Sequence, residues 1–300
     1  MKLFISGGSG FVGTHLSKNF LDQGYEVNGV GGSKENRHIT HKNYTYVSAD
    51  TTKAGEWQDY IKDADVVVNL TGRTIFHYWT KNYKKQIYDS RILTTRHIVS
   101  ALPRDRSVLF LSTSAIGIYG DCGDDNLPET HVKGDDFLAK VCQDWEKEST
   151  MVTSDNIQTI IMRFGVVLDA KSGAFPTMLL PYKFMVGGKI GSGAQWFPWI
   201  HIDDLMAAVN FTIKHRKSKI YNFCSPLPVR NKDSSKIMAE VFHKPSFFMT
   251  PAFIIRLGLK EFGDLLLFSQ KGYPKNLLKD GFEFKYPDFK KALEEIKSRS

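Results

Sequence analysis

The sequence predicts an α/β protein built on a doubly wound, parallel β-sheet. Two observations carry this prediction. A glycine-rich turn lies between a short apolar stretch at residues 3–6 and a stretch with helical apolar spacing. Further apolar stretches of strand length then follow along the chain, separated by helical stretches.

The first thirty residues predict a strand, a glycine turn, a helix and a second strand. Residues 3–6 form the first expected strand, and residues 25–30 form the second. Between them the expected helix ends at Gly24, and its apolar residues recur at helical spacing: Val12, Leu16, Phe20 and Leu21. This order is typical of a Rossmann-type βαβ unit.

The turn has the spacing Gly7-x-x-Gly10-x-x-Gly13. Gly7 permits a tight turn, Gly10 lets the backbone approach a pyrophosphate, and Gly13 allows the helix to pack closely on the strand. Free N–H groups at the start of the helix then face the phosphates. The motif predicts a dinucleotide site, and a purely structural turn is the lesser alternative.

The end of the second expected strand favours NADP over NAD. Sites that prefer NAD place an acidic residue there, on the ribose 2′-hydroxyl. Here the position holds Gly31 and Gly32, and Lys34 and Arg37 follow. The two cations suit a 2′-phosphate, although they are equally well explained as ordinary charges of a loop.

Four further strands are expected, in the stretches 43–50, 63–72, 107–120 and 157–168. Ligands of such sheets bind where the strands end. The candidate cofactor contacts are therefore Gly7, Gly10, Phe11, Val12, Gly13, Lys34, Arg37, Asp50, Asn69, Leu70, Thr71, Gly72 and Arg163.

Composition excludes several classes of protein. The net charge is +8, but the densest basic cluster, 214–219, follows an apolar helical stretch and is explained by the helix dipole. We therefore expect no nucleic-acid partner. Three widely separated cysteines predict neither disulfides nor a metal site. With no signal-peptide pattern and no long apolar run, a cytoplasmic protein without a membrane partner is expected.

Longer motifs then resemble a known family. "GGSGFVG", "NLTG", "STSAIGIYG" and "WIHIDDL" occur in the order found in extended short-chain dehydrogenase/reductases. The block 163–205 and the C-terminal "GFEFKYPDFKKAL" resemble the atypical, NAD(P)-dependent epimerase-family proteins of that group, whose substrate is unassigned. The resemblance implies a small C-terminal substrate domain and a monomer or homodimer.

The resemblance also exposes a missing motif. Relatives in the wider superfamily use a Tyr-x-x-x-Lys pair on one helix, in which the lysine lowers the pKa of the catalytic phenol. The expected helix here is "DDFLAKVCQDWE", residues 135–146, and it has no tyrosine. Ser114 best matches the hydroxyl position of the fifth strand and is the candidate catalytic residue, with Ser112 and Thr113 as close competitors. Asp136, Lys140 and water are the other candidate proton donors.

Three residues are candidate substrate contacts. Lys84 and Arg91 lie seven residues apart, on one face of an expected helix, and Lys84 is more simply explained as an ordinary solvated charge. Arg91 suits a carboxylate or phosphate, but it could equally pair with a structural acid. Trp196 could stack on a substrate or belong to the core. The amphipathic stretch 252–270 favours a core-facing helix of the small domain over a helix on a membrane surface.

The sequence therefore predicts a Rossmann-type NADP-binding domain, 1–165 and 200–225, with a smaller mixed substrate domain, 166–199 and 226–300. The expected activity is an NADP-dependent oxidoreductase or epimerase acting on a small, anionic hydroxyl or carbonyl compound. A regulatory NADP-binding protein with little catalysis is the alternative.

Overall fold

The computed structural model describes residues 1–152, 154–217 and 219–299, and the chain divides into two compact units. Unit 1 consists of Met1–Ile75, Thr80–Ser114 and Val141–Met162, and unit 2 consists of Phe76–Trp79, Ala115–Lys140 and Arg163–Ser300. The segment 200–225, predicted to return to the nucleotide domain, lies in unit 2. The predicted domain boundaries stay a prediction.

The main sheet has seven strands in the order β12-β7-β5-β4-β1-β2-β3. The pairings of β1 with β2 and β4, of β2 with β3, and of β4 with β5 are all parallel. This architecture confirms the predicted α/β class with a Rossmann-type sheet. Its register places Ser6 opposite both Val30 and Asn69. The carboxyl ends of β1, β2 and β4 therefore meet at one edge.

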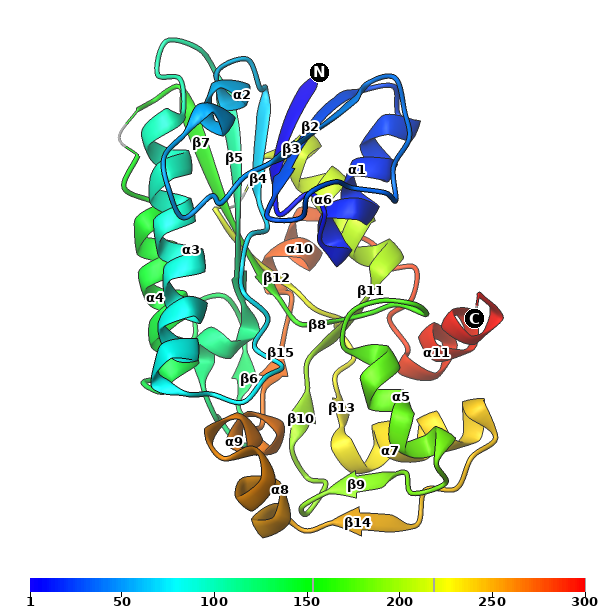
Figure 1. The fold of residues 1–300 in the computed structure, drawn as a ribbon. Coiled ribbons are helices and arrows are strands. Elements are labelled where there is room, and N and C mark those ends of the chain that lie inside the picture. Colours follow the sequence, from blue (N-terminus) through cyan, green and yellow to red (C-terminus); the bar gives the residue numbers. More distant parts are fainter. Residues whose placement is uncertain (153, 218, 300) are drawn as a thin grey trace. The chain divides into compact units, whose positions relative to one another are not determined.

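Figure 1 shows the elements of unit 1, with α3 and α4 side by side on one side of the strands and α1 on the other. The elements wholly in unit 1 are β1 (Lys2–Ser6), α1 (Phe11–Asp22), β2 (Glu26–Gly31), β3 (Tyr44–Ser48), η1 (Glu56–Gln58), α2 (Asp59–Lys62), β4 (Val66–Asn69) and α3 (Lys81–Ala101). Three elements run from one unit into the other: β5 (Val108–Ala115), α4 (Phe137–Ser149) and β7 (Ile157–Phe164).

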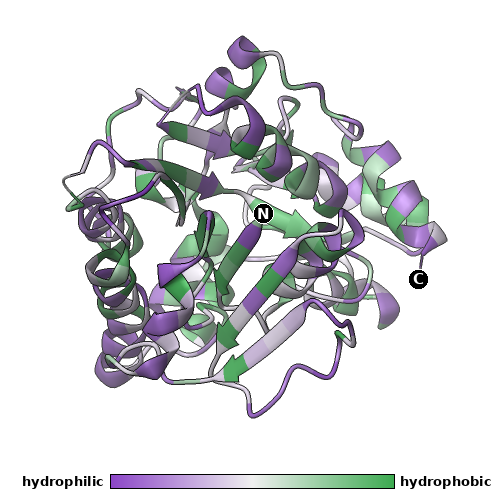
Figure 2. Ribbon diagram, turned by 90° about the horizontal axis from the view of Figure 1, so that it is seen from above, coloured by the Kyte–Doolittle hydropathy of each residue, from purple (hydrophilic) through white to green (hydrophobic). Residues whose placement is uncertain are grey.

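The core of unit 1 is apolar and aromatic. Phe4 of β1 stacks on Trp57, and both pack with Val67 of β4 and Phe110 of β5. Figure 2 shows hydrophilic and hydrophobic stretches on the same helices, as expected for helices that cover a sheet and face solvent. Two pairs join α3 to α4: Tyr88 donates to Asp144, and Arg96 pairs with Glu148.

Unit 2 is mixed and contains short two-stranded pairings. β8 pairs with β11, β9 with β14 and β6 with β15 in parallel, whereas β10 and β13 are antiparallel. Its elements are η2 (Ile116–Tyr119), β6 (Asn126–Leu127), β8 (Val166–Leu168), α5 (Phe175–Lys183), β9 (Gly188–Ile190), β10 (Trp196–Phe197), β11 (Trp199–His201), α6 (Ile202–His215), β12 (Ile220–Phe223), β13 (Val229–Arg230), α7 (Asn231–Phe242), β14 (Phe248–Thr250), α8 (Ala252–Leu259), α9 (Glu261–Leu267), β15 (Lys271–Gly272), α10 (Lys275–Asp280) and α11 (Phe289–Ser298).

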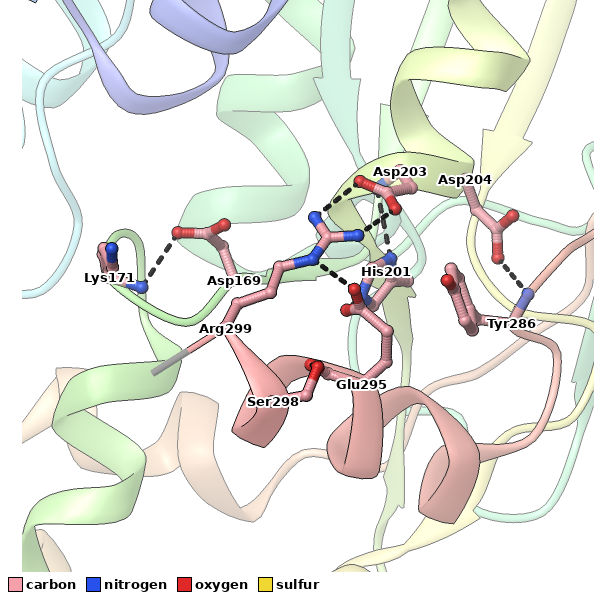
Figure 3. A network of polar contacts seen from close by, with 9 residues as sticks. All are labelled: Asp169, Lys171, His201, Asp203, Asp204, Tyr286, Glu295, Ser298 and Arg299. Atoms are coloured by element: carbon pink, nitrogen blue, oxygen red, sulfur yellow. Dashed lines mark hydrogen bonds and ion pairs between the residues drawn. The ribbon is translucent and has the colours of Figure 1, made fainter.

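A polar network ties the C-terminal helix α11 to the start of α6 (Figure 3). His201 is fully buried, and its Nδ1 accepts the Asp203 amide while its Nε2 lies 2.8 Å from Glu295 Oε2. The two terminal guanidinium nitrogens of Arg299 donate hydrogen bonds to the two carboxylate oxygens of Asp203, at 3.0 and 2.5 Å. His201 is therefore a helix cap with both ring nitrogens engaged.

The Arg299–Asp203 pair predicts an acid-dependent contribution to stability. Burial is the largest single influence on Asp203 and opposes its ionisation, but the Arg299 hydrogen bonds and the charges of His201, Arg299 and Lys285 together outweigh it and hold the pKa of the carboxyl below its usual range. A depressed carboxyl pKa stabilises the fold above the unfolded value of about 3.9, and this stability is lost as pH falls through the folded pKa. We expect Asp203→Asn to lower the free energy of unfolding by about 1 kcal/mol at pH 7 and to leave it unchanged in strong acid.

Chemical denaturation at several pH values measures this difference. Glu240→Gln is the control, because Glu240 pairs with Lys290 on the exposed surface and should contribute little. A cost for Asp203→Asn that stays constant down to strong acid would contradict the ionic origin.

Among the described residues, no helix is both long and apolar enough to cross a membrane.

Candidate functional site: a glycine turn and a basic loop at one edge of the sheet

The glycine turn between β1 and α1 is fastened to the neighbouring strand ends. Gly7 has a φ of 79°, in the region that favours glycine. A Cβ on Gly7 would lie 2.9 Å from the carbonyl carbon of Leu70. The amides of Gly7 and Gly8 both donate to Val30 O, at 2.8 and 2.9 Å. The turn therefore lies directly between the ends of β2 and β4.

Gly10 and Gly13 occupy very different surroundings. A Cβ on Gly13 would lie 2.2 Å from Gly7 O, so only glycine fits there without a backbone shift. A Cβ on Gly10 would meet one atom, Gly7 O at 3.1 Å. Gly10 is the N-cap of α1 and supplies no side-chain acceptor. The first N–H groups of α1, including those of Phe11 and Val12, can therefore bind an external anion.

A hollow of about 350 Å³ lies at the end of β2. The loop that follows this strand provides most of its lining, and the glycine turn adds one residue: Ser9, Ser33, Lys34, Glu35, Asn36, Arg37 and His38. A Cβ on Gly31 would lie 2.8 Å from Ser9 Oγ, so any side chain at that position would have to displace the Ser9 hydroxyl. The hollow thus combines hydroxyls, amides and two cations with one carboxylate.

The carboxylate of this loop is already engaged. Arg37 donates to Glu35 Oε1, with Nε at 2.6 Å and a second nitrogen at 2.5 Å. No ion pair involving Lys34 is present in the described part of the chain. Lys34 is therefore the loop cation whose charge is not neutralised, whereas Arg37 would have to leave Glu35 to bind another anion.

Three residues absent from the sequence prediction hold the loop in place. The amide of Asn36 donates to Gly8 O at 3.2 Å and to Tyr44 Oη at 2.9 Å. Tyr46 Oη donates to Ser33 O at 3.0 Å. Asn36 is buried, and burial also raises the pKa of Tyr44. The loop after β2, which contains Lys34 and Arg37, is thus held against the glycine turn and β3 by hydrogen bonds.

The predicted contacts on the other loops have partners within the chain. Asp50 accepts from the amide and hydroxyl of Thr52, and these bonds lower the pKa of its carboxyl. Asn69 is fully buried; its Nδ2 donates to Thr95 Oγ1, and its Oδ1 accepts the Thr71 amide. Both side chains shape their own loops, and their contact with a cofactor stays a prediction.

Arg91 lies against the loop after β4. A Cβ on Gly72 would lie 2.9 Å from Arg91 Cζ, so the guanidinium rests on the backbone of the loop. One guanidinium nitrogen donates to Arg73 O at 3.1 Å and to Ile87 O at 3.0 Å, and the group lies 5.2 Å from the Trp145 ring. No carboxylate among the described residues pairs with it, and burial lowers its pKa. This arrangement disfavours the alternative of a structural acid partner.

The remaining predicted contacts differ in their surroundings. Lys84 is half-buried on α3. Arg163 of unit 2 is 1% exposed and donates to Tyr119 Oη at 2.8 Å and to Glu129 O at 3.0 Å. These partners place its guanidinium in the interior of that unit. Its predicted cofactor contact remains untested.

Trp196 has polar partners on several sides. Its Nε1 donates to Asp124 at 2.8 Å, and its ring lies 4.3 Å from the Arg230 guanidinium and 5.1 Å from the Lys271 ammonium. Stacking on a substrate would compete with these cations, so that role stays a prediction.

Ser114 belongs to a buried pair with a helix residue. Its Oγ donates to Glu146 Oε1 of α4 at 2.8 Å, and both residues are buried. Ser112, two residues earlier on the same face of β5, bonds Ser149 of α4 at 2.7 Å. Glu146 was not predicted as a site residue. Ser112 and Ser114 lie two residues apart on β5, and Glu146 and Ser149 lie three residues apart on α4. This matching spacing was the sequence signal that could have indicated the two pairs.

Helix α4 contains no tyrosine: it has the sequence FLAKVCQDWEKES. The other candidate proton donors lie at its beginning, in unit 2. Asp136 accepts the amides of Leu138 and Ala139 and so caps the helix, while Lys140 is exposed. The carboxylate of Asp136 is thereby engaged in capping. Within the described ranges, no three acidic, histidine or cysteine side chains are arranged to hold a metal ion.

Comparison with known families agrees with this geometry. The model of the "NAD dependent epimerase/dehydratase family" matches residues 3–224, and that of "Domain of unknown function (DUF1731)" matches residues 250–296. The chain belongs to the NAD dependent epimerase/dehydratase family. The predicted membership of the atypical extended short-chain dehydrogenase/reductases is thereby confirmed, together with a nucleotide-binding Rossmann fold.

Individual relatives extend over the whole chain. "Epimerase family protein YfhF" of Bacillus subtilis (strain 168) is 35% identical over 300 residues, which is 99% of this chain and 98% of the relative. The crystal structure of "human epimerase family protein SDR39U1 (isoform2) with NADPH" is 25% identical, with a TM-score of 0.86 and 100% coverage of both chains.

A more distant structure shares the fold alone. "UDP-Glucuronic acid 4-epimerase from Bacillus cereus in complex with NAD" is 15% identical, with a TM-score of 0.77, and the match covers 100% of this chain and 99% of that one. The two solved structures thus contain different nicotinamide cofactors, and a nucleotide cofactor is common to both.

Proposed function

We propose that this protein is an NADP-dependent oxidoreductase or epimerase acting on a small, anionic hydroxyl or carbonyl compound. The observation that carries the proposal is the basic hollow at the end of β2, which contains Lys34 and Arg37 and lacks an acid at Gly31 and Gly32. A 2′-phosphate needs cations and hydrogen-bond donors at this point of the fold, whereas a free ribose hydroxyl is usually held by an acid. The NADPH in the human relative supports the same choice.

Different residues around the glycine turn would bind different parts of the cofactor. The first amides of α1 would bind the pyrophosphate, which Gly10 allows to approach closely. Lys34, with Ser9 and Ser33, would bind the 2′-phosphate. Asn36 would keep this loop in register with the glycine turn through Gly8 O. The cofactor, when bound, would accept or donate a hydride at the substrate carbon.

Lys34 and Glu35 give a direct test of the NADP assignment. Lys34→Ala removes the unpaired cation and should weaken the binding of NADPH about tenfold or more. The affinity for NADH should stay nearly unchanged. Glu35→Gln should strengthen the binding of NADPH, because it removes a negative charge and frees Arg37 from its ion pair. Calorimetric dissociation constants for both cofactors measure these effects.

Lys18→Ala is the control for this experiment, since Lys18 is an exposed lysine outside the hollow. Equal wild-type affinities for the two cofactors, or tighter binding of NADH, would overturn the NADP assignment.

Arg91 is the proposed anchor for the anionic part of the substrate. It is a half-buried cation that carbonyl groups hold in place and that no carboxylate neutralises in the described structure. Arginine binds carboxylates and phosphates through two parallel hydrogen bonds, which lysine cannot reproduce.

Arg91→Lys should therefore raise the KM for an anionic substrate about tenfold or more with little effect on cofactor affinity. Steady-state kinetics on a panel of small keto acids and their uncharged amides measures this. An equal rise in KM for both classes of compound would contradict charge recognition by Arg91.

In the proposed reaction, Ser114 and Glu146 transfer the proton of the substrate hydroxyl. Ser114 donates to the Glu146 carboxylate, which leaves both lone pairs of its oxygen available to accept a hydrogen bond from a substrate hydroxyl. The carboxylate can then take up a proton through the serine oxygen, which is general base catalysis without a tyrosine. The alternative, a regulatory NADP-binding protein, would show cofactor binding but no turnover that depends on Ser114.

A further inference from the structure

Unit 2 exposes an apolar surface that the sequence prediction placed in the core. Helix α8, Ala252–Leu259, contains no buried residue. Phe253 is 68% exposed and Leu257 is 79% exposed. The predicted core-facing helix is therefore wrong for this part of 252–270, whereas α9 does bury Phe262.

Two neighbouring segments extend this surface. Phe247, immediately before β14, is 79% exposed, and Phe184, at the end of α5, is 70% exposed. The β9–β14 pairing brings these segments together, because Phe248 lies opposite Gly188. α8 begins two residues after β14, and Figure 1 shows α8, β9 and β14 at the same end of unit 2. We call residues 184–186, 247–249 and 253–257 the apolar patch.

The two segments that contain the apolar patch carry charge of one sign, and acids begin only beyond them, at Glu261 and Asp264. The segments 180–190 and 244–260, which contain the patch, hold five cations and no aspartate or glutamate: Lys183, Lys189, Lys244, Arg256 and Lys260. Two of these cations have partners, since Arg256 pairs with Asp264 at 2.8 Å and Lys260 lies 5.1 Å from the Tyr78 ring. The other three have no ion-pair partner in the part of the chain that the structure describes, and they can add to a positive rim.

We propose that the apolar patch binds the surface of an anionic lipid bilayer. Phenylalanine and leucine side chains on a short amphipathic helix, bordered by lysine and arginine, are the pattern of helices that lie in the bilayer interface. Lysines near the patch would contact anionic headgroups, and each adds to the attraction. A second copy of this chain fits less well, because it would bring the same positive charge against this one.

Vesicle co-sedimentation of the full-length chain tests the proposal. We expect binding to vesicles of equal parts phosphatidylglycerol and phosphatidylcholine, weak binding to pure phosphatidylcholine, and loss of most binding in roughly 1 M salt. Replacing Phe247, Phe253 and Leu257 together by Ser should weaken binding about tenfold or more. Lys183→Gln with Lys244→Gln should weaken binding to the anionic vesicles only.

Matched controls separate the patch from general effects. Val132→Ser with Met151→Ser removes exposed apolar side chains elsewhere, and Lys18→Gln with Lys42→Gln removes exposed cations elsewhere. Both controls should bind like the wild type, and thermal unfolding should show that every variant is folded.

Three outcomes would overturn the proposal: wild type that does not bind anionic vesicles, a triple variant that binds as well as wild type, or controls that lose binding equally. If the first outcome comes with a dimer that dissociates in the triple variant, the patch is instead an interface between copies.

Discussion

Replacing Ser114 by Ala is expected to lower turnover by about 10²- to 10⁴-fold, the usual contribution of general acid–base catalysis. The hydroxyl is the only group that links the Glu146 carboxylate to a substrate oxygen in the proposed reaction. Cofactor affinity should change little, because the variant removes no group that binds the dinucleotide. Single-turnover reduction of NADP with a panel of small hydroxy acids measures the effect, because that direction releases the proton which Glu146 must take up.

Ser112→Ala is the matched control, because Ser112 is also buried on β5 and also bonds α4. It should retain most of the activity. Glu146→Gln should resemble Ser114→Ala, since an amide cannot take up the proton. If Ser112→Ala and Ser114→Ala lose activity equally, the serines serve the packing of α4 on β5 rather than the chemistry.

Gly13→Ala is expected to cost about 3 kcal/mol of unfolding free energy, at the upper end of the range for overpacking. Its Cβ would lie 2.2 Å from Gly7 O and 2.9 Å from Gly8 Cα, both backbone atoms. The glycine turn or α1 must therefore move. Urea denaturation measures the loss.

Gly117→Ala provides the comparison for this variant, because a Cβ at that position would meet nothing within 4 Å apart from the neighbouring backbone of its own turn. It should change stability by less than about 1 kcal/mol. Similar losses in the two variants would show that the close approach at Gly13 is not the cause.

The arrangement of unit 1 could be predicted because local patterns determine it. Apolar stretches ending in a glycine turn specified β1, α1 and β2, and the parallel pairing of β1 with β2 follows from the helical crossover between them. The tight turn at Gly7 has the positive φ that its motif requires.

Contacts between distant residues could not be predicted in the same way. Asn36 lies 28 residues from Gly8, and an asparagine in a polar loop gives no sign that its side chain will be buried. Glu146 appeared only as an acid on a helix, and its partner Ser114 is 32 residues away. The exposure of α8 was missed because apolar spacing predicts that a helix has an apolar face but not what covers it.

Binding of NADPH to Gly10→Val tests the central claim most directly. The valine side chain would project from the N-cap of α1, where the chain itself offers one contact, Gly7 O at 3.1 Å, and where we place the pyrophosphate. Calorimetry should show loss of measurable NADPH binding, while the melting temperature of the unliganded protein stays close to that of wild type. An unchanged dissociation constant for NADPH in this variant would contradict the assignment of the glycine turn as the cofactor site.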